Sequence, residues 1–152
     1  MNGRTIRGAG LAALLLLAAC GGDDDGAGPS PSGLTGTWRA TKVELVNVAN
    51  PTEKVELVAL GMVLTAELNA NETCRITSTF PGQPEEVITG TWSSSSEVFT
   101  IRHSEGGNTI TWQFDWNLSG NTLTLSGADN ELDFDGDDLG DPAKLNLVLV
   151  RQ

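Results

Sequence analysis

Apolar and polar side chains alternate with a period of two along most of the chain beyond residue 33. The clearest run covers residues 109–118. Its apolar side consists of Ile110, Trp112, Phe114, Trp116 and Leu118. An extended strand places successive side chains on opposite faces, so this run predicts a strand with one buried and one hydrated face. No stretch beyond residue 33 has the spacing typical of an amphipathic helix. The pattern therefore predicts an all-β domain.

The same alternation recurs in the segments around residues 60–68, 74–80, 88–92, 99–103, 122–125 and 145–151, and an opening strand is expected at 37–46. Residues typical of turns fill the connections at 69–71, 81–84, 93–96, 105–108 and 119–121. Two connections, 47–59 and 128–142, are long. Loops of that length in a compact domain are usually functional or disordered.

About eight strands joined mainly by short hairpins form a meander. A meander either closes into an up-and-down barrel or folds into a sandwich. Closure removes the exposed edges of the sheet, whose unpaired backbone groups invite aggregation. The sequence therefore favours one antiparallel up-and-down β-barrel over residues 34–152.

The N-terminal segment has the features of an export signal. Arg4 and Arg7 precede an apolar run at 11–17, which is too short for the roughly 20 residues of a spanning helix. Residues 17–20, Leu-Ala-Ala-Cys, resemble the bacterial lipobox. The resemblance implies that residues 1–19 are a cleaved signal peptide and that Cys20 carries acyl chains such as palmitate. Gly21 then favours the outer membrane of a Gram-negative envelope. Residues 20–33 have no bulky apolar side chain beyond the cysteine and suit a flexible acidic tether.

A second resemblance rests on Gly36-Thr37-Trp38 in the first strand and Arg151 in the last. This pair resembles the lipocalin signature, and residues 34–152 as a whole are similar to small bacterial lipocalin-like lipoproteins. The resemblance implies an eight-stranded barrel in which Trp38 closes the narrow end and Arg151 lies across it. A guanidinium over an indole gains cation–π attraction. The chain lacks the disulfides and C-terminal helix of secreted lipocalins and is shorter, so a barrel filled by its own side chains stays an alternative.

The chain is acidic, with 9 basic and 20 acidic residues and a net charge of −11. Removing residues 1–19 deletes Arg4 and Arg7, which leaves 7 basic against 20 acidic residues, a net charge of −13. Such a balance disfavours binding to nucleic acid and direct adhesion to anionic lipid. With Cys20 committed to lipid, Cys74 has no partner for a disulfide, and its place in a strand pattern predicts a buried, inert thiol.

Catalytic chemistry finds little support in the sequence. His103 is the single histidine, on a strand face with Phe99 and Ile101, so burial or a place at the barrel rim is expected rather than catalysis. We therefore expect a protein that is not an enzyme.

An acidic stretch at 129–141 contains Asp133, Asp135 and Asp137, which superficially resemble a calcium loop. An EF-hand starting at Asp133 needs Gly at position 6 and Glu at position 12, where the chain has Asp138 and Lys144. Weak binding of Ca²⁺ there is an alternative to a hydrated loop. No other cofactor is expected.

The interior of the barrel is the expected ligand site. Trp112, Phe114, Trp116, Met62 and Leu64 are candidates for its wall, with residues 47–59 as a lid, although the aromatic stripe alone is more typical of core. The first hypothesis is an envelope-anchored lipoprotein that binds a small hydrophobic molecule or lipid. The alternative is a filled barrel that acts as a structural or protein-interaction module of the envelope.

Overall fold

The structure, a computed structural model, describes residues 31–152. The predicted signal peptide, the predicted lipidation site Cys20 and the tether up to residue 30 lie outside this range. Among the residues described, no helix is both long and apolar enough to span a membrane.

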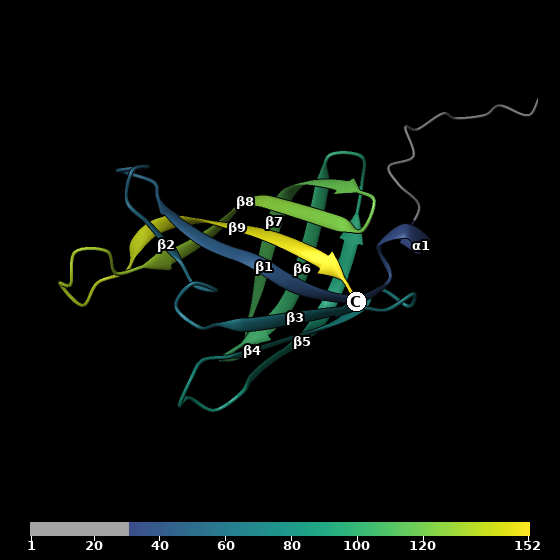
Figure 1. The fold of residues 1–152 in the computed structure, drawn as a ribbon, viewed down its shortest axis with the longest axis horizontal. Helices are drawn as coiled ribbons and strands as arrows, with labels where there is room; N and C mark the ends of the chain where they lie inside the picture. Colours follow the sequence, from purple (N-terminus) through teal and green to yellow (C-terminus); the bar gives the residue numbers. More distant parts are fainter. Residues whose placement is uncertain (1–30) are drawn as a thin grey trace, which may run out of the picture.

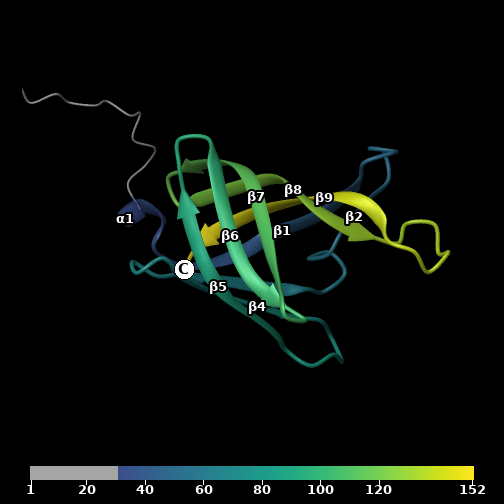
Figure 2. The same cartoon turned by 180° about the vertical axis from the view of Figure 1, so that it is seen from behind.

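One helical turn and nine strands make up the described chain (Figure 1). They are α1 (Pro31–Leu34), β1 (Gly36–Asn47), β2 (Lys54–Glu56), β3 (Val63–Leu68), β4 (Thr73–Thr79), β5 (Glu86–Ser94), β6 (Val98–Glu105), β7 (Asn108–Ser119), β8 (Thr122–Leu132) and β9 (Asp141–Arg151). From β3 to β9 each strand pairs antiparallel with the next, and Figure 2 shows β4 to β7 from behind.

The last strand returns to the first, and this pairing closes the sheet. The register runs from Trp38 opposite Arg151 to Asn47 opposite Ala143. On its other side β1 pairs first with β3, at residues 36–39, and then with the short β2, at residues 44–46. The result is a closed antiparallel barrel of eight strands with β2 as an added piece. The predicted lipocalin-like barrel is confirmed, and the sandwich is excluded.

Two β-bulges bend the strands that the closure joins. The register shifts between Ala40 and Lys42 in β1, and between Leu125 and Ala128 in β8. At the second bulge Gly127 has a positive φ of 89°, and its N–H donates to Oδ1 of Asn146 at 3.0 Å. A bulge adds one unpaired residue and increases the local twist. Beyond each bulge, residues of the opposite parity therefore face the interior.

The two long loops of the sequence prediction are shorter in the structure. The prediction placed residues 128–142 in a loop, but β8 continues to Leu132 and β9 begins at Asp141, so the connection is 133–140. The connection at 47–59 holds β2. Both differences have one cause: backbone pairing continues beyond the point where a simple period-two pattern ends. The turn at Gly106-Gly107 was predicted correctly, and both residues have positive φ, as type I′ hairpins require. The turn predicted at 93–96 lies instead at 95–97, because β5 continues to Ser94.

A single inward face supplies the core. Its largest fully buried side chains are Trp38, Phe99, Phe114, Leu34, Leu123, Leu125 and Val43. Cys74 is also buried, as predicted, and burial raises the pKa of its thiol despite the N–H of Gly90, which acts in the opposite direction. Cys74 therefore packs in the core as a small apolar residue, and its neutral thiol is a poor nucleophile.

Strand direction gives the barrel two different ends. The open end comprises the connections 48–62, 80–85, 106–107 and 133–140 with the strand residues next to them. The closed end comprises α1 and the connections 69–72, 95–97 and 120–121. In Figure 1 the 133–140 loop projects on the side of the molecule opposite α1.

Trp38 and Arg151 seal the closed end. The guanidinium carbon of Arg151 lies 4.3 Å from the centre of the Trp38 ring, and its two terminal nitrogens donate to the carbonyl oxygens of Thr35 and Gly33 at 2.5 Å each. The indole N–H of Trp38 donates to the carbonyl of Leu34 at 2.9 Å. These bonds hold the segment of α1 across the closed end of the barrel.

Gly36 is required by the same arrangement. Its φ is +132°, which L side chains rarely adopt, and a Cβ there would lie 2.6 Å from Nη1 of Arg151. The Gly-x-Trp spacing thus leaves room for the arginine that covers the tryptophan.

Replacing Arg151 by Met should lower the free energy of unfolding by about 2–4 kcal/mol. The variant loses the cation–π contact and leaves two backbone carbonyls without their charged donor. Urea unfolding followed by tryptophan fluorescence measures the change. Arg39→Met is the matched control, because Arg39 is exposed on the outer face of β1 and should change stability by less than about 0.5 kcal/mol. Equal effects of the two variants would contradict this role of Arg151.

Candidate functional site: an apolar cavity in the barrel

The interior holds a cavity of about 310 Å³. Aliphatic side chains from many strands form most of its wall, among them Val43, Leu45, Leu64, Ile76, Leu125 and Leu147. The exposed side chains of Glu86 and Glu105 also line it, so the cavity reaches solvent at the open end. We call this opening, bordered by Glu86, Glu105, Leu57, Met62 and Asn130, the mouth.

Three of the five predicted wall residues line the cavity, namely Met62, Leu64 and Trp112. Phe114 and Trp116 do not border it. Phe114 is fully buried opposite Phe99, and Trp116 lies closer to the closed end, where its indole N–H donates to the carbonyl of Ser95 at 2.9 Å. Strand β7 runs from the open to the closed end, so one aromatic stripe serves as cavity wall at its start and as core further on.

The connection predicted as a lid lies at the mouth and contributes Leu57 to the cavity wall. The N–H of Leu57 donates to the carbonyl of Val43 at 2.8 Å. The carboxylate of Glu56 accepts the N–H groups of Val43 at 3.0 Å, Val58 at 3.1 Å and Ala59 at 2.5 Å. The bond from Val43 has the largest effect, and together these bonds lower the pKa of Glu56, although desolvation acts to raise it. Ionised Glu56 therefore holds this connection in place.

The sequence prediction missed several residues that line the mouth, including Glu105, Glu86 and Leu57. Glu105 continues the alternation of Phe99, Ile101 and His103, so the pattern itself could have placed it on the inner face. Leu57 follows an irregular segment and carries no such signal.

His103 is buried, with 5% of its surface exposed, and lines the cavity. Its ring packs against Trp112 with centres 4.7 Å apart. Within residues 31–152, its Nε2 has no hydrogen-bond partner. An unsatisfied buried polar atom costs about 1–3 kcal/mol, so this nitrogen is a place where a polar group would be stabilised.

Gly90 explains how His103 fits against the neighbouring strand. A Cβ at Gly90 would lie 2.1 Å from the carbonyl oxygen of Arg102 and 3.1 Å from Cβ of His103. The glycine thus permits the close approach of β5 to β6. The glycine of the second Gly-Thr-Trp, at 90–92, has this packing role.

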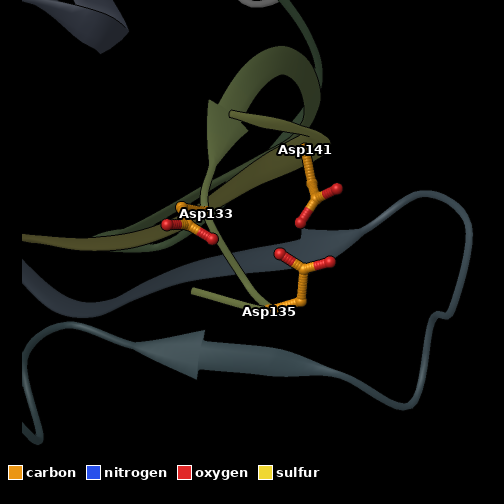
Figure 3. Close-up of side chains that lie close together, drawn as sticks. All are labelled: Asp133, Asp135 and Asp141. Atoms are coloured by element: carbon orange, nitrogen blue, oxygen red, sulfur yellow. The ribbon is translucent and has the colours of Figure 1, made fainter. Parts of the chain in front are cut away.

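A cluster of carboxylates lies on the loop between β8 and β9 (Figure 3). Oxygens of Asp133, Asp135 and Asp141 lie within 4.8 Å of one another. The sequence prediction named Asp137 as the third member, but this group contains Asp141 instead, since the loop folds back onto the start of β9. Asp137 accepts the N–H of Leu139 at 2.9 Å.

Backbone groups already occupy several oxygens of the cluster. Asp133 accepts the N–H groups of Gly136 at 2.6 Å and Asp138 at 3.0 Å, and Asp141 accepts that of Phe134 at 3.0 Å. Ca²⁺ takes six to eight oxygen ligands. Binding of Ca²⁺ at this loop stays a prediction.

The pKa values of two of these carboxyls move in opposite directions. The N–H of Gly136, followed by those of Asp138, Asp137 and Asp135, outweighs desolvation and lowers the pKa of Asp133. For Asp135 the N–H of Asp137 acts to lower the pKa, but repulsion from Asp137, Asp141 and Asp133 together with desolvation raises it. The ionised carboxylate of Asp133 therefore stabilises the loop through its hydrogen bonds, whereas that of Asp135 is repelled by the neighbouring carboxylates.

No match to the chain is found among known protein families, curated proteins or solved structures.

Carboxyl-carbon NMR across a pH titration should find the pKa of Asp133 below, and that of Asp135 above, the usual range for aspartate. The lowered pKa of Asp133 means that its stabilisation of the loop is present above its unfolded pKa and is lost as pH falls through the folded one. The raised pKa of Asp135 has the opposite sign, so its contribution is lost as pH rises.

Asp141→Asn should bring the pKa of Asp135 toward its ordinary value, because it removes a charge while its amide oxygen retains the bond from Phe134. Asp115→Asn, on the exposed face of β7, is the control and should leave Asp135 unchanged. Indistinguishable pKa values for Asp133 and Asp135 would refute the assigned roles.

Proposed function

We propose that this chain is a lipid-anchored envelope protein whose barrel binds a small hydrophobic molecule without catalysing a reaction. One observation carries the proposal: the barrel encloses an apolar cavity that is sealed at one end and open at the other.

The size and lining of the cavity suit a compact apolar ligand. Ligand pockets usually measure about 300–1,000 Å³, so about 310 Å³ lies at the lower limit. Each square ångström of apolar ligand surface removed from water contributes about 25 cal/mol. A short alkyl chain against Leu64, Leu125 and Leu147 would gain its affinity mainly in this way.

In this proposal one end of the barrel is closed by hydrogen bonds, and the ligand enters at the other end. Hydrogen bonds from Arg151 and Trp38 fix the closed end, whereas the mouth is bordered by Leu57 and Met62 from a connection without long strands. A ligand would therefore enter through the mouth, where Glu86 and Glu105 are exposed to solvent, beside the connection that Glu56 holds in place. The predicted tether joins the barrel at α1, at the closed end, so an anchor on Cys20 would leave the mouth unobstructed.

A second candidate function is a protein-interaction module at the same end. The large apolar side chains that the described residues expose, Val48, Leu60, Val63, Val87 and Leu139, all lie at the open end. An exposed apolar group can mark a contact surface. Crosslinking of the anchored protein in cells, lost on Leu139→Asp with ligand binding intact, would favour this candidate.

The purified protein should bind decanol saturably, with a change in tryptophan fluorescence, because Trp112 forms part of the cavity wall. Ala66→Phe places a ring in the cavity and should weaken binding at least about tenfold. Thr89→Phe, on the exposed outer face of β5, is the matched control and should bind as the unmodified protein does. Absence of saturable binding to the unmodified protein would overturn the proposal.

The anchor has a separate test. Metabolic labelling with palmitate in a bacterial host should label the unmodified chain and Cys74→Ser but not Cys20→Ser, since only Cys20 lies in the lipobox-like segment. Label on Cys20→Ser would refute anchoring at that residue.

A further inference from the structure

The open end of the barrel concentrates negative charge. Its acidic residues are Glu53, Glu56, Glu85, Glu86, Glu105, Asp129, Glu131, Asp133, Asp135, Asp137, Asp138 and Asp141. The same segments contain two lysines. Lys54 lies 3.6 Å from the carboxylate of Glu44, and Lys144 lies 2.5 Å from that of Asp129. Both lysines are therefore already paired, while Arg102, three residues before the end of β6, is an exposed cation at a comparable position.

Part of this charge borders the cavity directly. Glu86, the first residue of β5, and Glu105, the last of β6, line the mouth. A shallower hollow next to it is lined by Glu105, Trp112, Asp129 and Glu131. A concave surface with one sign of charge and low-dielectric walls concentrates ligands of the opposite sign. Carboxylates can also accept hydrogen bonds from a ligand.

His103 adds a polar position further inside. It lies two residues deeper along β6 than Glu105, on the same face, and its Nε2 has no partner within the described chain. A neutral imidazole offers one acceptor nitrogen. An N–H or O–H of a ligand could satisfy this atom after a shift of the Trp112 ring, which packs against it.

We infer that the cavity selects an amphiphile whose polar end is a cationic hydrogen-bond donor, of which a primary alkylamine is the simplest example. The inference rests on the proposed function. The alkyl body lies against the leucines, and the ammonium group lies between Glu86 and Glu105 at the mouth and His103 further inside. A fatty acid of equal length would bring its carboxylate into the same negative field, and its anion offers no donor for these acceptors.

Three ten-carbon compounds that differ only in the polar end test the inference: decylamine, decanol and decanoate. Decylamine and decanoate are titrated below their micelle concentrations, and decanol below its solubility limit, into residues 20–152 with Cys20→Ser. Binding is followed by tryptophan fluorescence and calorimetry. Decylamine should bind about tenfold or more tighter than decanoate, with decanol between them. High salt should narrow this ratio, because the mouth is exposed to solvent.

Glu86→Gln with Glu105→Gln should reduce the preference for decylamine over decanoate about three- to tenfold, with a smaller loss of decanol binding, because the hydroxyl of decanol carries no charge and can still bond the amide oxygens. The matched control is Glu67→Gln with Glu97→Gln, which removes the same charge from exposed positions near the closed end. His103→Phe retains a ring against Trp112 but removes the nitrogen, and it should weaken decylamine and decanol alike.

The outcomes separate the two proposals. Saturable binding of all three compounds with equal affinity, or tighter binding of decanoate, overturns the charge selection and leaves the hydrophobic site standing. Saturable binding of none overturns both. A preference that the control pair reduces as much as the mouth pair assigns the effect to overall charge, and it overturns the role of Glu86 and Glu105.

Discussion

The pairing of β1 with β9 is the constraint on which the rest of the structure depends. Without it, eight strands would form an open sheet with two unpaired edges and an exposed apolar face. With it, the inner face becomes an interior, and an interior can contain a cavity. Arg151 over Trp38 fastens the pair at one end, since the arginine of β9 bonds the carbonyls of the segment that leads into β1. Among the described residues, this contact closes the end of the barrel opposite the mouth.

Much of this architecture follows from the period of two. Alternation places Leu145, Leu147 and Leu149 on the inner face without knowledge of any partner strand, and the Gly106-Gly107 turn specifies its hairpin. The closed end, in contrast, was expected only from the resemblance of Gly36, Trp38 and Arg151 to the lipocalin signature, because no local rule pairs two positions so far apart in the sequence. Local rules suffice where each residue's environment is set by its own strand.

The bulges mark the point where local rules fail. Beyond Gly127 the inner positions change parity, so Ala128 and Asn130 face inward within a stretch whose composition is typical of a loop. Phe114 and Trp116 were assigned to the same wall as Trp112 for a related reason. A strand pattern gives the face of a side chain but not its height in the barrel, and a cavity depends on height. Asp141 joined the acidic cluster through the fold of the loop, which spacing along the chain does not encode.

Solubility is the simplest explanation of an acidic surface, and it does not require the charges to lie at any particular place on that surface. In this barrel their distribution is uneven. The closed end and its flanks carry Glu67, Glu72, Glu97 and Asp115, whereas the segments of the open end carry most of the other described carboxylates, two of them on the cavity wall. Mutual repulsion raises the pKa of Asp135, so the crowding has an energetic cost. Glu86 and Glu105 line the apolar cavity at its exposed end, and a ligand that enters past them explains charge at these two positions better than hydration alone does.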